Sequence, residues 1–329
     1  MSHSNIAIFV PHLGCPHQCS FCNQKHITGQ SIQPTKQDIE KAVATAVSSN
    51  RFDSKAAEIA FFGGSFTAID RNYMIELLEC AYSYVANGVV SGIRVSTRPD
   101  CIDAEILDIL KKYGVTAIEL GAQSMVDSVL VSNNRGHRAE DVVNASNQVK
   151  SYGFELGLQM MTGLYTSSDE LDIITAERLI ELKPNTVRIY PTIILKNTEL
   201  EQRFVSGEYK PADIESAVKL AALLDDMFVS NGIKVIRIGL HSIDESAYVA
   251  GPWHPAFREL CDSMQFRNKL EKQLISGHSY EVLVSPKALS KAIGQKKANI
   301  DYFLSKNIEI VFKTQDGINP LNFIVKEVK

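Results

Sequence analysis

The feature that most constrains the fold is an alternation of short apolar runs with amphipathic segments between residues 6 and 190. The segments between the runs, such as residues 37–48 and 140–152, carry apolar residues at helical spacing. Short strands that alternate with helices are typical of βαβ units in a parallel sheet. We therefore predict an α/β fold, a partial, TIM-like (βα)6 barrel. Its expected strands are residues 6–10, 57–62, 92–97, 117–121, 154–161 and 186–190.

Polar or glycine-rich stretches follow five of these predicted strands. Ligand sites of parallel α/β folds form at the carboxyl ends of the strands, where such stretches meet. This shared placement predicts an active site along one edge of the sheet. The five stretches are residues 15–22, 63–65, 96–98, 123–124 and 159–163.

Three of the six cysteines stand directly after the first predicted strand, spaced C-x3-C-x2-C. They are Cys15, Cys19 and Cys22. Closely spaced thiolates suit soft metals, above all zinc or an iron–sulfur cluster. In the zinc alternative His26 completes a Cys3His set, with His12 or His17 as substitutes. That alternative accounts for the first polar stretch and leaves the other four unexplained.

The cysteine spacing resembles the signature of the radical S-adenosylmethionine (radical SAM) enzymes. The resemblance implies that the three cysteines hold a [4Fe–4S] cluster, whose open iron chelates S-adenosylmethionine. Phe21 would be the aromatic residue close to the adenine. An external one-electron donor, such as flavodoxin or ferredoxin, would reduce the cluster. The cofactor would then split into methionine and a 5′-deoxyadenosyl radical, which takes hydrogen from the substrate.

The same resemblance assigns cofactor contacts at the ends of other strands. Gly63-Gly64-Ser65 stands where the family has a Gly-Gly-Glu-like stretch for the methionine amino group. Ser96 stands where many relatives place an acid for the ribose hydroxyls, and Gln159 where some carry Asp. Both substitutions keep hydrogen-bonding ability and lose the charge. The alternative for residues 63–65 is an ordinary strand-to-helix turn.

Gln123 and Arg135 resemble a paired feature of the family. By the match, Gln123 would touch the cofactor and Arg135 would bind its carboxylate through two parallel hydrogen bonds. A solvated loop cation is the alternative for Arg135. Arg98 would face either substrate or solvent, and His137 is either a catalytic acid–base or a structural loop histidine.

Several segments in the same order resemble the catalytic subunit of Elongator, which modifies wobble uridine in tRNA with an additional acetyltransferase domain. We expect no such domain within these 329 residues. We therefore expect a match to stand-alone bacterial relatives that share the radical SAM domain, with RNA (tRNA) as substrate. The alternative is oxidation of a porphyrinogen, because the Gln123/Arg135 pairing also resembles coproporphyrinogen dehydrogenases. The segments are residues 62–67, 96–100, 134–137, 188–192 and 197–200.

The C-terminal part is predicted as a separate small α+β domain, with a barrel domain at 1–265 and this domain at 266–329. Its βααβ order and the joint Ile293-Gly294…Ile300 resemble a KH RNA-binding module, although Lys297 stands where a second glycine is expected. Residues 281–329 hold eight Lys and five acids, a local +3. A domain that only covers the open barrel edge is the alternative. Before this domain we expect a helix at 214–231, a strand at 234–240, a loop at 241–255 and a long helix at 257–275.

Composition narrows the remaining possibilities. The formal charge of −4 excludes a strongly basic protein, and no apolar run reaches the roughly 18 residues of a membrane span. The isolated Cys80, Cys101 and Cys261 argue against a disulfide framework, and no secretory signal is expected. We therefore expect a cytoplasmic protein. A third function, a zinc-stabilised RNA-binding protein without catalysis, stays open at this point.

Overall fold

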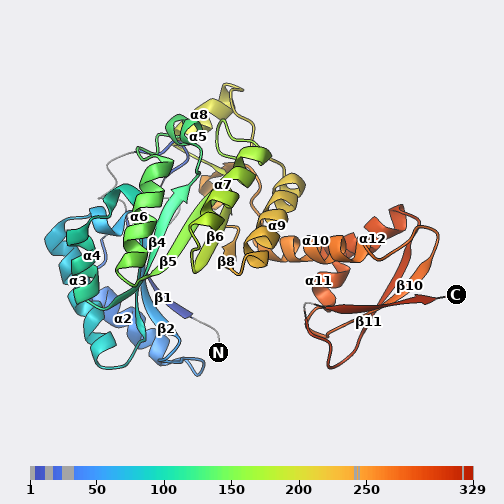
Figure 1. The fold of residues 1–329 in the computed structure, drawn as a ribbon, viewed down its shortest axis with the longest axis horizontal. Helices are drawn as coiled ribbons and strands as arrows, with labels where there is room; N and C mark the ends of the chain where they lie inside the picture. Colours follow the sequence, from blue (N-terminus) through green and yellow to red (C-terminus); the bar gives the residue numbers. More distant parts are fainter. Residues whose placement is uncertain are drawn as a thin grey trace.

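The structure, a computed structural model, describes residues 4–11, 18–23, 33–240, 243, 245–320 and 322–328. These residues form a large half-barrel and a smaller unit beside it, joined through helix α10 (Figure 1). The half-barrel lies around a curved sheet with helices on its outer side (Figure 1).

The large sheet contains seven strands among the described residues, in the order β1-β2-β3-β4-β5-β6-β8, and every neighbouring pair is parallel. The predicted α/β half-barrel is confirmed, with seven strands in place of six. The additional strand is β8, which follows helix α9 and pairs with β6. The strands are β1 (Ser4–Val10), β2 (Ala57–Gly63), β3 (Gly92–Thr97), β4 (Val115–Gln123), β5 (Glu155–Thr162), β6 (Thr186–Pro191) and β8 (Lys234–Ile238).

Helices follow the strands, and several of them begin at residues whose side chains cap free backbone N–H groups. Asp103, Ser168 and Asp213 cap α4, α7 and α9 in this way. No helix in the described ranges is long and apolar enough to cross a bilayer. The helices of the half-barrel are α2 (Lys36–Val47), α3 (Arg71–Ala86), α4 (Ala104–Lys112), α5 (Asp127–Ser132), α6 (Ala139–Ser151), α7 (Asp169–Glu181), α8 (Glu199–Val205) and α9 (Ile214–Ser230).

The two faces of the sheet differ in polarity because alternate side chains of a strand point to opposite faces. On β4, Ile118 and Leu120 pack in the main hydrophobic core, whereas Glu119 between them points to the other face. On β3 the core residues likewise alternate with Arg94 and Ser96. The concave face of the half-barrel is therefore lined by polar and charged side chains.

The smaller unit is a three-stranded mixed sheet with helices packed on it. The central strand β10 pairs parallel with β11 and antiparallel with β12. The predicted βααβ order is present, but β12 was missed because most of its side chains are exposed and it lacks a continuous apolar face. Its elements are β10 (Ser279–Val284), α11 (Leu289–Ile293), α12 (Ala298–Ser305), β11 (Glu309–Thr314) and β12 (Phe323–Val328).

Helix α10 (Phe257–Glu271) belongs to both hydrophobic cores. Phe257 and Cys261 pack in the core of the half-barrel, and Phe266 and Leu270 pack in the core of the smaller unit. The boundary predicted at 265/266 falls inside this helix. One continuous helix therefore holds the smaller unit against the half-barrel.

A short hairpin-like pair of strands was not predicted. The predicted loop at 241–255 contains β9 (Tyr248–Ala250), which pairs antiparallel with β7 (Ile194–Leu195) just after β6. The pairing joins residues more than fifty positions apart, and local sequence patterns do not report such distant contacts.

Candidate active site

The residues predicted to bind cofactors gather at or near the carboxyl end of the sheet. Gly63 and Gln123 are the last residues of β2 and β4, and the cysteine stretch follows β1. Cys19 and Cys22 are described, whereas Cys15 and the alternative ligands His12, His17 and His26 lie outside the described residues. Cys19 is buried and Cys22 half-buried, and the backbone N–H of Cys22 donates to the Cys19 carbonyl at 3.1 Å.

The cysteine segment is held in place by Asn133, a residue that the sequence analysis missed. The backbone N–H of Ser20 donates to the Asn133 carbonyl at 3.1 Å, and the Ser20 hydroxyl donates to Asn133 Oδ1 at 2.8 Å. Asn133 is fully buried, and its amide donates to the carbonyls of Val129 and Tyr165. The backbone N–H of Leu200 donates to the Ser20 carbonyl at 2.8 Å, so α8 also holds the segment. The only sequence signal for Asn133 was its place next to the Asn134–His137 motif.

Arg135 contacts the cysteine segment directly. Its Nη1 donates to Cys19 Sγ at 3.1 Å, and its Nη2 donates to the Gly121 carbonyl at 2.7 Å. Both Arg135 and Cys19 are only 6% exposed. The alternative of a solvated loop cation is therefore wrong, because tertiary contacts bury the side chain. Nε of Arg135 is buried without a hydrogen-bond partner among the described residues.

Arg98 does not face solvent. It is 3% exposed, and its Nε and Nη2 donate to the two carboxylate oxygens of Asp100, each at 2.8 Å. Burial alone would raise the pKa of Asp100, but the hydrogen bonds from Arg98 outweigh it and lower the pKa. Nη2 of Arg98 also donates to the Arg135 carbonyl. Arg98 thus supports the backbone of the loop that carries Arg135.

Gln123 and Gln159 lie together beside Arg135. Gln159 Nε2 donates to Gln123 Oε1 at 3.2 Å. The register of β4 against β5 shifts between Gly121 and Gln123, and Gln123 has a φ of 64°. A Cβ at position 121 would lie 2.8 Å from the Gln123 side-chain nitrogen and 3.5 Å from Arg135 Nη2. Glycine at this position therefore makes room for both predicted cofactor-binding side chains.

The glycine pair after β2 lies directly beside the end of β1. Gly63 has a φ of 115°, and a Cβ there would be 2.6 Å from the Val10 carbonyl oxygen. The N–H of Gly64 donates to the same carbonyl at 3.0 Å, and Ser65 is buried. This turn needs glycine both for its φ and for the close approach. Phe21 is half-buried and packs against apolar residues that follow β4 and β5.

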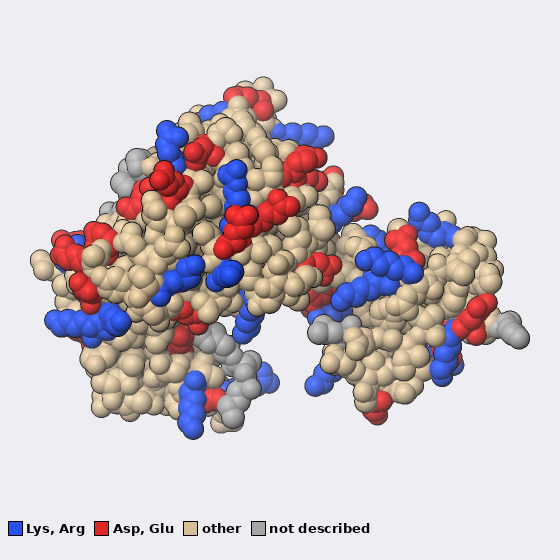
Figure 2. Space-filling view, viewed as in Figure 1, with Lys and Arg blue, Asp and Glu red and all other residues tan. Residues whose placement is uncertain are grey.

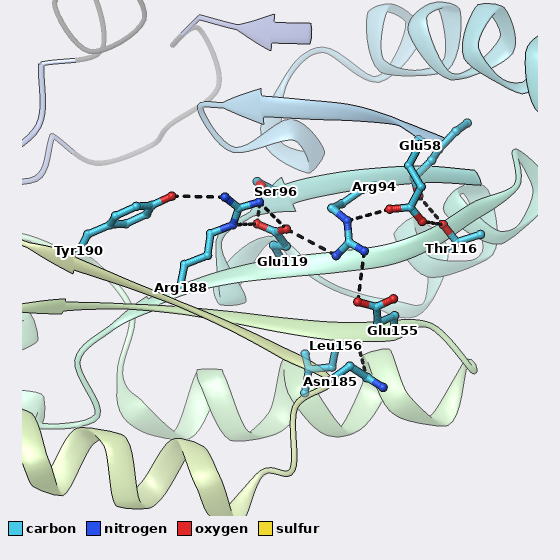
Figure 3. A network of polar contacts seen from close by, with 11 residues as sticks. Glu58, Arg94, Ser96, Thr116, Glu119, Glu155, Leu156, Asn185, Arg188 and Tyr190 are labelled. Carbon is cyan, nitrogen blue, oxygen red and sulfur yellow. Dashed lines mark hydrogen bonds and ion pairs between the residues drawn. The ribbon is translucent and has the colours of Figure 1, made fainter. Parts of the chain in front are cut away.

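Ser96 belongs to a network of charges on the concave face of the sheet (Figure 3). Its hydroxyl lies 3.5 Å from Glu119 Oε2. Arg188 donates to both oxygens of Glu119, at 2.7 and 3.0 Å, and Arg94 Nη1 lies 3.4 Å from Glu119 Oε1. Arg94 also donates to Glu58 at 2.9 Å and to Glu155 at 3.1 Å.

The carboxylates of this network decide the charge state of its arginines. Burial alone would lower the pKa of Arg188, but Glu119 outweighs it and raises the pKa. Arg94 likewise has a raised pKa, because its three carboxylate partners outweigh burial. The guanidinium of Arg188 also lies over the Phe62 ring, 5.1 Å from its centre. The sequence analysis missed this network because its members come from strands far apart in the chain.

His137 is a structural residue by its surroundings. It is 3% exposed, and its Nε2 lies 3.2 Å from the Ala122 carbonyl oxygen. Burial, and next the charge of Arg135, lower its pKa to about 4. The imidazole is therefore neutral near pH 7, which favours the structural interpretation over catalytic acid–base work.

The donor set at this edge fits a soft, anionic metal group. Two cysteines of one short segment lie here, and a buried guanidinium donates a hydrogen bond to the sulfur of one of them. Among the described residues no three His, Cys, Asp or Glu side chains gather closely enough to hold a metal ion, and Cys15 is not among these residues. The structure thus brings Cys19, Gln123, Arg135 and Gln159 together, whereas Ser96 belongs to the separate charge network.

Comparisons with known proteins point the same way. The profile of the radical SAM superfamily matches residues 9–179, and that of the radical SAM C-terminal domain matches residues 184–265. A tRNA uridine(34) acetyltransferase of Dehalococcoides mccartyi is 27% identical, over 74% of this chain and 64% of the relative. An uncharacterised protein of Methanocaldococcus jannaschii is 29% identical, over 75% of this chain and 74% of the relative.

Among solved structures, the archaeal Elp3 of Methanocaldococcus infernus, lacking residues 1–46, has a TM-score of 0.63 at 19% identity. The match covers 82% of this chain and 64% of the Elp3 chain. This likeness shows a shared fold. The chain spans less than two thirds of both this Elp3 and the acetyltransferase of Dehalococcoides mccartyi.

Proposed function

This chain belongs to the radical SAM superfamily, and from that premise we propose that it is a radical SAM enzyme acting on RNA, with tRNA as its substrate class. The superfamily implies a [4Fe–4S] cluster and S-adenosylmethionine. We assign Cys15, Cys19 and Cys22 as the cluster ligands, with an external one-electron donor as partner. The relationship to tRNA uridine(34) acetyltransferases supports tRNA over other substrates.

The chain's own residues bind and orient these groups. When bound, cluster and cofactor supply one-electron cleavage of a carbon–sulfur bond. Gly63 and Gly64 let backbone atoms approach a ligand beside the cysteine segment, because neither carries a side chain. The Gln123–Gln159 pair offers amide donors and acceptors, and Phe21 adds an apolar wall that excludes water.

The single observation that carries the RNA proposal is the turn between α11 and α12. Lys296 and Lys297 are exposed and have φ values of 53° and 67°. A left-handed conformation costs about 1–2 kcal/mol for a residue with a Cβ, and two in succession are rare. The chain therefore keeps two strained lysines at the place where a KH module has its nucleic-acid loop. Strain that persists in this way is characteristic of functional turns.

The turn is fixed relative to the half-barrel through α10. Asn299, which is 2% exposed, donates to the Ser263 carbonyl and to the Ser263 hydroxyl, each at 3.1 Å. A Cβ at Gly294 would lie 2.9 Å from the same hydroxyl oxygen. The lysine turn therefore rests on the helix that also packs in the core of the half-barrel. An RNA bound at this turn would be held at a fixed position relative to the half-barrel.

The charge around the turn favours phosphate. Within the described residues neither Lys296 nor Lys297 has an acidic partner at ion-pair distance, whereas Lys291 lies 2.5 Å from Asp262 and Lys313 pairs with Glu281. Figure 2 shows Lys and Arg side chains, with a few acids among them, over the part of the smaller unit where α10 and α12 lie. Unpaired lysines bind phosphate with release of counterions.

The binding experiment measures the affinity of the cluster-loaded protein for bulk tRNA between 50 and 200 mM salt. Replacing Lys296 and Lys297 together by Gln is expected to reduce the slope of log affinity against log salt by about 1.4–1.8, for two lost phosphate contacts. The matched control is Lys313→Gln, which removes a lysine already paired with Glu281. An unchanged slope in the double variant, or no tRNA binding by the wild type, contradicts the RNA proposal.

The activity experiment measures 5′-deoxyadenosine released under reducing, anaerobic conditions with and without tRNA. We expect tRNA to stimulate its formation, and the Lys296/Lys297 double variant to lose that stimulation while keeping the basal cleavage. Stimulation by a porphyrinogen and not by tRNA would support the small-molecule alternative in its place.

A further inference from the structure

We propose that Arg135 sets the reduction potential of the cluster through its hydrogen bond to Cys19. This inference rests on the proposed function, because it requires the cluster on the cysteine segment. Hydrogen bonds to ligand sulfurs and nearby charge are among the factors that set the potential of iron–sulfur clusters. Arg135 supplies both from one side chain.

The contact is buried and its geometry is that of a hydrogen bond. Arg135 Nη1 lies 3.1 Å from Cys19 Sγ, and each residue is 6% exposed. Water therefore screens the guanidinium charge little at this sulfur, because both partners are inside the protein. A cation so placed stabilises added negative charge on the cluster and raises its potential.

The guanidinium is held in place by contacts that do not involve a ligand. Its Nη2 donates to the Gly121 carbonyl at 2.7 Å, at the bulge that ends β4. The backbone N–H of Arg135 donates to the Leu130 carbonyl at 3.0 Å, and its carbonyl accepts from Arg98. These contacts fix Arg135 from β4, α5 and the Arg98–Asp100 pair. Contacts within the chain therefore hold the guanidinium against Cys19.

The charge of Arg135 is not neutralised by an acid. Among the described residues no carboxylate lies within ion-pair distance of Arg135, whereas Arg98 pairs with Asp100 and Arg188 with Glu119. The positive charge at the cysteine segment is therefore available to the sulfur. This separates the proposed role from the carboxylate-binding role predicted from the family, which acts only when S-adenosylmethionine is present.

The test is a potentiometric titration of the reconstituted full chain without S-adenosylmethionine, followed by electron paramagnetic resonance of the reduced cluster. We expect Arg135→Gln to lower the equilibrium constant for one-electron reduction about tenfold, which is about 59 mV. Arg135→Lys keeps the positive charge, and its cluster is expected to have a reduction potential between those of the wild type and Arg135→Gln. The matched control is Arg138→Gln, an exposed arginine of the same loop paired with Asp127, which is expected to leave the potential unchanged.

The outcomes separate this inference from the proposed function. Wild-type protein that binds no iron and sulfide contradicts the proposed function itself. An Arg135→Gln variant with a full cluster and the wild-type potential overturns the inference and leaves the proposed function standing. A weaker binding of S-adenosylmethionine with no change in potential would assign Arg135 to the cofactor's carboxylate alone.

A second measurement covers the case in which Arg135→Gln does not load a cluster. Wild-type protein grown with ¹⁵N-labelled arginine is reduced, and the nitrogen coupling to the cluster is measured by pulsed electron paramagnetic resonance. We expect a ¹⁵N coupling to the cluster in the wild type. The Arg135→Lys variant, labelled in the same way, is expected to lack it. The absence of any arginine nitrogen coupling in the wild type overturns the inference.

Discussion

The half-barrel holds buried arginines in two different environments. On the concave face, Arg94 and Arg188 are surrounded by carboxylates, and Glu119 bridges the two (Figure 3). At the carboxyl end of the sheet, Arg135 is equally buried but donates to a thiol and a backbone carbonyl. The first arrangement is balanced within the chain, whereas the second leaves positive charge facing the cysteine segment.

This difference separates structural charge from functional charge. A buried charge that is paired with acids needs no ligand, and removing one partner leaves the other uncompensated. By contrast, we propose that the unpaired guanidinium of Arg135 serves the group bound at the cysteine segment. The lysine turn of the smaller unit follows the same logic at the surface, where two cations lack acidic partners among the described residues.

The largest effect is expected from a substitution that disrupts the charge network around Glu119. Glu119→Gln leaves Arg188 and Arg94 without their shared carboxylate, and we expect a loss of about 3–5 kcal/mol in the free energy of unfolding. Urea unfolding of the cluster-free chain measures it. Arg135→Gln orphans no acid and is expected to cost clearly less. Equal losses for the two variants would contradict the distinction between the two environments.

A pH experiment probes the charge at the carboxyl end of the sheet. The pKa of His137 is lowered to about 4 in the folded state by burial and by Arg135. The unfolded chain binds the proton near pH 6.5, so stability falls as the pH drops from 6.5 to 4, by about 3 kcal/mol in total. His137→Gln removes this dependence. The difference in free energy of unfolding between pH 7 and pH 4.5, measured with urea, should therefore be about 2–3 kcal/mol smaller in the variant than in the wild type. An unchanged gap contradicts the assignment of a neutral, buried imidazole.

The anchoring of the cysteine segment is tested at Asn133. Asn133→Ala removes the acceptor of the Ser20 hydroxyl and the side-chain donor to the Tyr165 carbonyl, a loss of about 1–3 kcal/mol in the free energy of unfolding, and we expect lower iron content after reconstitution. Asn134→Gly is the matched control, because Asn134 is exposed, has a φ of 53° and bonds only to Glu199 among the side chains described. Full iron loading of Asn133→Ala would show that Ser20 does not need this anchor.

The smallest expected effect concerns the lysine turn. Lys297→Gly relieves a left-handed residue with a Cβ, so we expect the chain to become more stable by up to about 1 kcal/mol. The same change removes one phosphate contact and is expected to weaken tRNA binding at low salt. Thermal unfolding and a binding titration measure the two effects. A variant that binds tRNA as well as the wild type would show that the strain serves no RNA contact.

The sheet and the edge that carries the site were predictable because both depend on local patterns. Apolar runs of strand length mark the strands, and the ends of parallel strands necessarily meet at one edge. The seventh strand in the sheet, β8, was recognised as a strand, but its pairing with β6 was not, since α9 separates them. The fold class could therefore be predicted from the sequence, whereas the number of strands in the sheet could not.

The partners of buried polar side chains were not predictable from the sequence. Glu119 and Arg188 are 69 positions apart, and Ser20 and Asn133 are 113 positions apart. Such contacts depend on the register of neighbouring strands and on where loops pack. For the same reason Arg135, which the sequence left between a loop cation and a ligand, acquired its contact with Cys19 only in the folded chain.

The most direct test of the account is cofactor cleavage by Cys19→Ala after anaerobic reconstitution. We expect the variant to lose the cluster's iron and sulfide and all reductive cleavage of S-adenosylmethionine, while the chain still folds before reconstitution. The control is Cys80→Ala, at a half-buried thiol on α3, which is expected to keep both the cluster and the cleavage of S-adenosylmethionine. Cleavage retained by Cys19→Ala, or a tetrahedral zinc ion in place of the cluster in the wild type, would contradict the assignment.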